Sequence, residues 1–362
     1  MINNELKRRN IPNFFVHNGE EISTLEKWEA YRPILKDLFL NSEYGRMPEK
    51  IVPTIREEEQ EINFAGKAVW KSVFFTFKNN GMEHTVRCEL VLPKSQRPAP
   101  VFVSIGFSPD VPNKYLPMEE IIDNGFAVLH FFYENVTTDN GDFSNGLYPL
   151  LSAKRDFGKI TVWSYMASVC MDYLQSRDDV DKSAIAVIGH SRLGKTALLT
   201  SALDERFLLT CVNESGCCGA ALSRGKNEQN ENITTITDVF PWWFCEDFFA
   251  YRDNEDKMDF DQHLLLALVA PRYAVIGGAI EDVWADNEGQ YLSCHLASKA
   301  WGFYGKGGLS YEGNDLPKAG EKRLDGELGF YLRSGSHFQS REDWGVYMKK
   351  FREIIEERKN ES

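Results

Sequence analysis

The sequence is poor in three things: basic charge, cysteine and long hydrophobic runs. Its 41 lysines and arginines face 54 aspartates and glutamates, and the net charge of −13 argues against nucleic acid or an anionic membrane surface as the main partner. The longest apolar region, residues 264–280, is interrupted by Pro271 and Arg272. Neither part reaches the roughly 20 residues that a membrane helix needs, so we expect no membrane span.

The seven cysteines do not suggest a disulfide framework. Their number is odd, Cys217 and Cys218 are neighbours, and no C-x-x-C pair occurs, so we expect reduced thiols and neither disulfides nor a zinc site. The first residues, MINNELKRRNIPNFF, are polar and charged where a secretory signal needs an apolar segment. The sequence as printed is therefore expected to stay in the cytoplasm, and nothing in it indicates an oligomeric state.

No repeat or low-complexity linker divides the chain. We expect a catalytic domain over residues 51–362, preceded by a helical extension over residues 1–50. Within the extension, apolar residues recur at helical spacing from Thr24 to Tyr44, and Ser23 is the expected N-cap. This helix is predicted to pack on the main domain.

The catalytic region begins with strand-like alternation over residues 69–92, which Asn79-Asn80-Gly81 interrupts as a hairpin turn. An antiparallel hairpin that leads into successive β-α units predicts an α/β fold, with a mostly parallel sheet covered by helices on both faces. Ligands of such sheets bind at the carboxyl ends of the strands. The expected strands are PVFVSIGF, FAVLHFFY, AIAVIG, LLTCVNE, YAVIGG and GFYLRSG, and the expected helices lie near residues 118–123, 160–175, from 192 onward, and 342–355.

The segment VIGHSRLGKT, residues 187–196, admits two interpretations. Read as G-x-x-x-x-G-K-T from Gly189 to Thr196, it matches the phosphate-binding loop of nucleotide-dependent ATPases and kinases. No strand nearby ends in a convincing magnesium-binding aspartate, which weakens that interpretation. Read as a turn between a strand and a helix, the segment presents Ser191 as a nucleophile. The spacing is then G-x-S-x-x-G, because the second glycine is Gly194.

A serine nucleophile needs a base within hydrogen-bond reach and a carboxylate that orients the base. In α/β hydrolases these groups occur in the order serine, acid, histidine. Downstream of Ser191, Glu214 ends the next expected strand, Glu281 and Asp282 follow the strand after that, and His337 lies in the loop after the last strand. All of these positions fall at one edge of the predicted sheet. The identity of the acid stays open between Glu214 and the later pair.

Four short segments carry a resemblance to a known family: GHSRLGK from Gly189, NESG from Asn213, FPWWF from Phe240 and SGSH from Ser334. In these segments the chain resembles the glucuronoyl esterase family of carbohydrate esterases and the related bacterial pectin methylesterase-like enzymes, over about residues 26–351. The resemblance implies an α/β-hydrolase fold, a three-layer αβα sandwich. It also implies hydrolysis of uronic acid esters in plant cell-wall polysaccharides by a serine, a histidine and an acid, with no metal or cofactor.

Carried over residue by residue, the resemblance implies that Ser191 is the nucleophile, His337 the base and Glu214 the acid, with Asp282 as the alternative acid. It further implies that the backbone N–H and the side chain of Arg192 donate to the oxyanion. Such preorganised donors contribute about 3 kcal/mol each. Lys195, one helical turn later, is expected to contact sugar hydroxyls or the carboxyl side of a uronate.

Three further expectations concern the surroundings of the nucleophile. By analogy with the fold, a second oxyanion donor comes from the loop at Phe107. Trp284 is expected to stack on a sugar face, whereas His190, in the tight turn itself, is expected to be structural. The pair of Gln and Glu that the family places on the uronate is not assigned within residues 223–244.

We therefore expect a serine esterase that acts on an esterified, uronic-acid-containing plant cell-wall saccharide. An acetyl esterase for xylan or pectin oligosaccharides is the alternative with the same triad and a smaller acyl pocket. A P-loop nucleotide hydrolase and a catalytically inactive sugar-binding module are the remaining alternatives.

Overall fold

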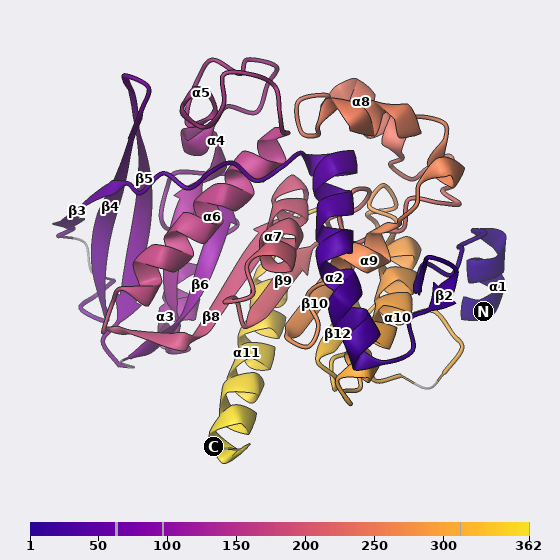
Figure 1. The fold of residues 1–362 in the computed structure, drawn as a ribbon. Helices are drawn as coiled ribbons and strands as arrows, with labels where there is room; N and C mark the ends of the chain where they lie inside the picture. The colour runs from indigo at the N-terminus through magenta and orange to yellow at the C-terminus, as the bar shows by residue number, and fades with distance from the viewer. Residues whose placement is uncertain (62–63, 96–97, 312, 362) are drawn as a thin grey trace.

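A ten-stranded sheet runs through the computed structural model, which describes residues 1–61, 64–95, 98–311 and 313–361 (Figure 1). The strand order is β11-β12-β10-β9-β8-β6-β7-β5-β4-β3. The strands are β3 Thr54–Glu59, β4 Ala68–Asn79, β5 Met82–Pro93, β6 Ala99–Gly106, β7 Ala127–Phe132, β8 Val180–His190, β9 Leu209–Asn213, β10 Tyr273–Ala279, β11 Lys322–Arg323 and β12 Leu328–Arg333.

The sheet has an antiparallel part and a parallel part, as the sequence predicts. Strands β4 and β5 form the expected hairpin, and Asn80 and Gly81 have φ angles of 51° and 77°, which a tight hairpin turn requires. Six strands, β7, β6, β8, β9, β10 and β12, then pair in parallel. Their carboxyl ends therefore meet at one edge of the sheet.

Helices cover both faces of this sheet, which confirms the predicted αβα sandwich of an α/β hydrolase. Residues of β6 show the alternation that results: Val101 and Val103 belong to one core cluster and Phe102 to the other. One face carries α6 Lys159–Gln175, α7 Arg192–Leu203, α9 Gln262–Ala267 and α10 Asn287–Phe303, and the opposite face carries α3 Met118–Asp123 and α11 Arg341–Glu361.

The N-terminal extension packs on the first of these faces. Its elements are α1 Ile2–Arg8, the two-stranded β1 Val16–His17 and β2 Glu20–Glu21, α2 Leu25–Phe39, and a π-helical turn η1 Leu40–Tyr44. The N-cap of α2 is Thr24, whose hydroxyl accepts from the Lys27 N–H at 3.3 Å, so the expectation of Ser23 as the cap is wrong. Trp28 is fully buried in the main core. The domain boundary after residue 50 stays a prediction.

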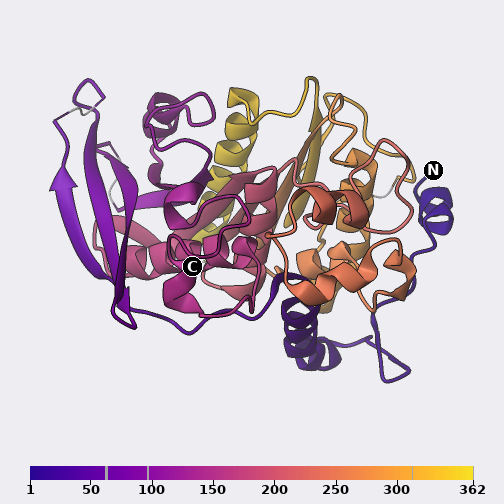
Figure 2. The ribbon, with the colours of Figure 1, turned by 90° about the horizontal axis from the view of Figure 1, so that it is seen from above.

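Two excursions of the chain lie above the carboxyl ends of the parallel strands (Figures 1 and 2). The first contains α4 Tyr133–Val136 and α5 Tyr148–Leu151, between β7 and α6. The second contains α8 Ile233–Val239 and the 3-10 turns η2 Glu246–Tyr251 and η3 Glu255–Lys257, between β9 and α9. Hydrogen bonds of 2.7 Å from the indole N–H groups of Trp242 and Trp243 to Oδ1 of Asp139 join the two excursions. Across the described ranges of the chain, no helix is long and apolar enough to cross a membrane.

Candidate active site

Ser191 occupies a strained turn between β8 and α7. Its φ of 57° and ψ of −127° are rare for a residue with a side chain. A Cβ at Gly189 would lie 2.0 Å from the Leu193 carbonyl oxygen, so only glycine fits there. A Cβ at Gly194 would lie 3.0 Å from the Asn213 carbonyl oxygen, because the helix passes close to the end of β9. The turn therefore needs its second glycine one position later than in G-x-S-x-G.

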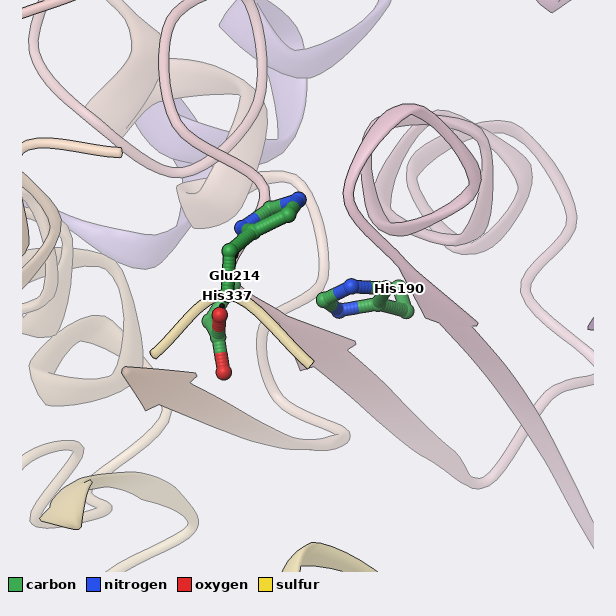
Figure 3. A group of neighbouring side chains, drawn as sticks. All are labelled: His190, Glu214 and His337. Atoms are coloured by element: carbon green, nitrogen blue, oxygen red, sulfur yellow. Dashed lines mark ion pairs between the residues drawn. The ribbon is translucent and has the colours of Figure 1, made fainter. Parts of the chain in front are cut away.

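His337 is held by both of the carboxylates that the sequence left as alternatives. Its Nδ1 lies 2.7 Å from Oδ2 of Asp282 and 3.2 Å from Oε2 of Glu214. Glu214 follows β9, Asp282 follows β10 and His337 follows β12, so three neighbouring parallel strands deliver the three groups. Figure 3 shows Glu214 beneath His337, with the ring of His190 beside them.

The two carboxylates differ in what else they contact. Glu214 is fully buried, its Oε1 lies 2.6 Å from Arg333 Nη2, and its Oε2 also accepts from the Phe338 N–H at 3.1 Å. Asp282 accepts from the Ala285 N–H at 3.3 Å through its other oxygen. Glu214 thus shares its charge with a buried guanidinium, whereas Asp282 places Oδ2 against the imidazole at the shorter distance.

These contacts shift the proton affinities of the cluster. Burial disfavours the charged imidazole, but the hydrogen bonds to Asp282 and Glu214 outweigh it and raise the pKa of His337 to about 9. Burial raises the pKa of Glu214 to about 7, against the lowering effect of His337. Burial acts in the same direction on Asp282, yet its hydrogen bond to His337 keeps its pKa below the ordinary value. Of the two carboxylates beside the imidazole, Asp282 thus has the lower pKa.

His190, Glu214 and His337 also offer donor atoms within 4.8 Å of one another, a set of ligand types that suits zinc (Figure 3). Their existing contacts favour another role. His190 Nδ1 lies 2.6 Å from Oδ1 of Asn213, and burial lowers the pKa of His190 to about 3. The Arg333 guanidinium on Glu214 would repel a cation at this place. The residues fit a network that orients the imidazole better than a metal site.

Ser191 and His337 both face one cavity of about 320 Å³ above the carboxyl ends of the strands. Within the described part of the chain, the Ser191 hydroxyl makes no hydrogen bond to another protein group. The cavity therefore brings a free hydroxyl and a braced imidazole together. It is lined by Ser191, Arg192, Lys195, Glu214, Ser215, Gly216, Glu231, Phe240, Trp243, Asp282, Trp284, Ala285 and His337.

Arg192 lies in the cavity wall directly after the serine. Its guanidinium makes an ion pair with Asp139 and lies beside the stacked rings of Phe240 and Trp243, 4.9 Å and 4.7 Å from their centroids. The N–H groups of Gly194 and Lys195 donate to the Ser191 carbonyl, at 2.9 Å and 3.1 Å, whereas the N–H of Arg192, the first residue of α7, has no acceptor within the helix. Both the side chain and the backbone of this residue are thus available beside Ser191.

Lys195 lies deeper than the sequence suggested. Its side chain is only 4% exposed, and Nζ donates to the Ser215 carbonyl at 2.6 Å and to Oε2 of Glu231 at 3.1 Å. With its ammonium held in this way, Lys195 is not placed like the lysine of a phosphate-binding loop.

Trp284 and Phe107 have different positions relative to the cavity. Trp284 lines it and is 48% exposed, so its indole is accessible to a ligand. Phe107, directly after β6, packs its ring 6.1 Å from that of His190 and does not line the cavity. Its backbone N–H as an oxyanion donor stays a prediction.

Sequence reasoning missed two acids of the site, Asp139 and Glu231. Both lie in loops without a motif, and Glu231 falls within residues 223–244, where the sequence analysis assigned no contact to the uronate. One feature of the sequence indicated that such acids must exist. Two cations, Arg192 and Lys195, in the first turn of a helix oppose its dipole and require carboxylate partners.

Comparison with known proteins is consistent with this geometry. The family profile described as "Glucuronyl esterase, fungi" matches residues 75–305. A carbohydrate esterase from an unknown prokaryotic organism is 30% identical, over 92% of this chain and 86% of its own length. A 4-O-methyl-glucuronoyl methylesterase from Schizophyllum commune is 27% identical, over 88% of this chain and 80% of its own.

Solved structures of glucuronoyl esterases have a similar fold. A glucuronoyl esterase from Solibacter usitatus is 29% identical with a TM-score of 0.85, covering 93% of this chain and 95% of that one. A glucuronoyl esterase of carbohydrate esterase family 15 from Teredinibacter turnerae is 26% identical with a TM-score of 0.87, covering 97% and 90%.

Proposed function

Since the chain belongs to the glucuronoyl esterase family, and is a carboxylic ester hydrolase of the α/β-hydrolase fold, we propose that it hydrolyses esters of uronic acids in plant cell-wall saccharides. The observation that carries the proposal is the cavity that joins Ser191, in its strained turn, with His337 held by two carboxylates. The related glucuronoyl methylesterase supports the glucuronoyl ester as the substrate class.

In the proposed reaction, His337 accepts the proton of the Ser191 hydroxyl through Nε2, and Ser191 Oγ attacks the ester carbonyl. The tetrahedral intermediate carries an oxyanion, to which the N–H groups of Arg192 donate. Collapse of the intermediate expels the alcohol, which takes the proton from His337 and leaves an acyl-serine. Water, deprotonated by His337, then releases the uronate and restores the serine.

Glu214 and Asp282 act on this reaction through His337. By accepting from Nδ1 they fix the orientation of the ring, so that Nε2 is the atom that faces the cavity. They also stabilise the imidazolium that forms when the base takes the serine proton. Trp284, at the open side of the cavity, is proposed to stack on the sugar.

The test is a time course by mass spectrometry with benzyl glucuronate and an acetylated xylo-oligosaccharide in one reaction, and with Ser191→Ala protein as the control. We expect loss of the benzyl ester by the wild-type protein alone. Release of acetate without loss of the uronate ester would instead establish the acetyl esterase. Turnover by Ser191→Ala protein would contradict the assignment of the nucleophile.

A further inference from the structure

The buried carboxylate of Asp139 lies behind the cavity and contacts two of its lining residues, Arg192 and Trp243. Asp139 lies in the loop between α4 and α5, and its side chain is 4% exposed. Its Oδ1 accepts from the indole N–H groups of Trp242 and Trp243, both at 2.7 Å. Its Oδ2 accepts from the Tyr133 hydroxyl at 3.1 Å and pairs with the guanidinium of Arg192. One carboxylate thus receives four donors from three separate segments.

This contact occupies one edge of the Arg192 guanidinium. The guanidinium also lies beside the rings of Phe240 and Trp243, which stack on each other with their centroids 3.9 Å apart. The Nε atom of Arg192 is buried and, among the residues that the structure describes, has no hydrogen-bond partner. Arg192 is therefore held in one orientation with its charge compensated by Asp139, while a quarter of its side chain stays exposed.

The second cation of the cavity is compensated in the same manner. Lys195 pairs with Glu231 at 3.1 Å, in a place where both side chains are nearly buried. The remaining titratable residues of the lining are Glu214, Asp282 and His337, and the imidazole is paired with both carboxylates. Of the described side chains that line the cavity, no Lys or Arg lacks a carboxylate partner.

This pattern matters because hydrolysis changes the charge of the ligand. The uronate ester is uncharged at the reacting carbonyl, whereas the product acid carries a full negative charge after its proton is lost. An unpaired cation would bind the product more tightly than the substrate. Paired cations donate hydrogen bonds to the carbonyl and to the oxyanion without that preference.

Resting on the uronoyl esterase function proposed above, we propose that Asp139 is a specificity-determining residue that makes the cavity favour the uncharged uronate ester over the anionic uronic acid. It does so by compensating the charge of Arg192 while fixing its donors. Glu231 does the same for Lys195. The enzyme thereby releases its acid product instead of being inhibited by it.

The test measures the binding of two ligands by calorimetry in Ser191→Ala protein, so that binding is independent of turnover. The ligands are methyl glucuronate and free glucuronic acid at pH 7. Asp139→Asn keeps the size of the side chain and an oxygen for the indoles but removes the charge. We expect Asp139→Asn to tighten binding of the acid by at least about fivefold, the effect that one unit charge has at about 4 Å even in water, and to change binding of the ester less than twofold.

Two further variants make the test specific. Asp142→Asn, an exposed acid of the same loop that contacts Ser144, removes the same charge from the protein without touching Arg192 and should leave both affinities unchanged. Glu231→Gln should tighten binding of the acid as Asp139→Asn does. It keeps the proposal testable if Asp139→Asn protein does not fold. For Asp139→Asn and for Glu231→Gln, added salt should reduce the gain in affinity for the acid.

Equal changes for acid and ester would show a purely structural role and overturn the proposal, as would unchanged acid binding in both folded variants. Failure of the proposed function has a different signature. It appears as absent turnover of benzyl glucuronate by the wild-type protein, whatever the relative affinities of acid and ester in these variants.

Discussion

The two carboxylates on His337 are expected to replace one another in part. At an effective dielectric constant of about 20, the difference between 2.7 Å for Asp282 and 3.2 Å for Glu214 corresponds to at most about 1 kcal/mol of Coulomb energy. Solvent at the imidazole, whose side chain is 44% exposed, reduces this difference further. Neither acid therefore supplies most of the Coulomb stabilisation of the imidazole. The loss of one acid leaves the other in contact with the same nitrogen.

From this geometry we expect Asp282→Asn and Glu214→Gln each to lower kcat/KM by about 10- to 100-fold, with Asp282→Asn the more costly by a few-fold. The double variant should lose about 10⁴-fold, the cost of removing the only acid of a triad. The product of the two single effects need not equal the double effect, since the pair acts as a unit.

The pH dependence of the reaction gives an independent measure. The base must be neutral, so kcat/KM should rise with pH through the pKa of His337, which the carboxylates raise to about 9. Removal of either carboxylate lowers that pKa, and the rising limb should move to lower pH. A merely structural defect would lower the whole profile without moving it.

The assay is the initial rate of benzyl glucuronate hydrolysis between pH 5 and 10, with circular dichroism as the check on folding. Glu281→Gln is the matched control, because Glu281 is exposed next to Asp282 and its side chain does not contact His337. The reasoning is refuted if Glu214→Gln alone loses as much as the double variant, or if Asp282→Asn leaves the rising limb where it is.

Three other expectations concern the nucleophile, the sugar and the extension. Ser191→Ala should lower kcat for benzyl glucuronate by about 10⁶-fold, measured from steady-state rates. A small loss would contradict its role as the nucleophile. Trp284→Ala should raise KM several-fold for a saccharide ester but not for a small aryl ester; equal changes in both would refute the stacking. Arg9→Ala breaks the buried pair with Asp286, 2.9 Å long, and should cost about 3 kcal/mol in urea unfolding; a cost near zero would show that the pair is dispensable.

The class of fold and the order of the functional groups followed from local patterns. Period-two alternation, the Asn-Gly turn and the repeated β-α units were enough for the hairpin, the parallel sheet and the edge where its strands end. Glycines at positions 189 and 194 indicated a tight turn, since backbone crowding excludes a Cβ there. Local patterns could not choose between Ser23 and Thr24 as the cap of α2, because both are good caps.

The electrostatics of the site depended on residues far apart in the chain. The sequence alone placed Glu214 and Asp282 as alternatives, because chain order permits one acid after either strand. Only the register of adjacent parallel strands brings both onto Nδ1 of His337. A hydrogen bond requires a donor–acceptor distance set to within a few tenths of an ångström. The periodicity of the sequence does not specify distances of that kind.

By itself, then, the sequence determined that a serine, an acid and a histidine meet at one sheet edge, since strand patterns and chain order are local properties. Tertiary structure alone decided how each charge is compensated. Asp139 reaches Arg192 across 53 positions of the chain, and Glu231 reaches Lys195 across 36. Such partners come from loops whose paths depend on packing. A cation is stable in a buried place only when a carboxylate is buried beside it.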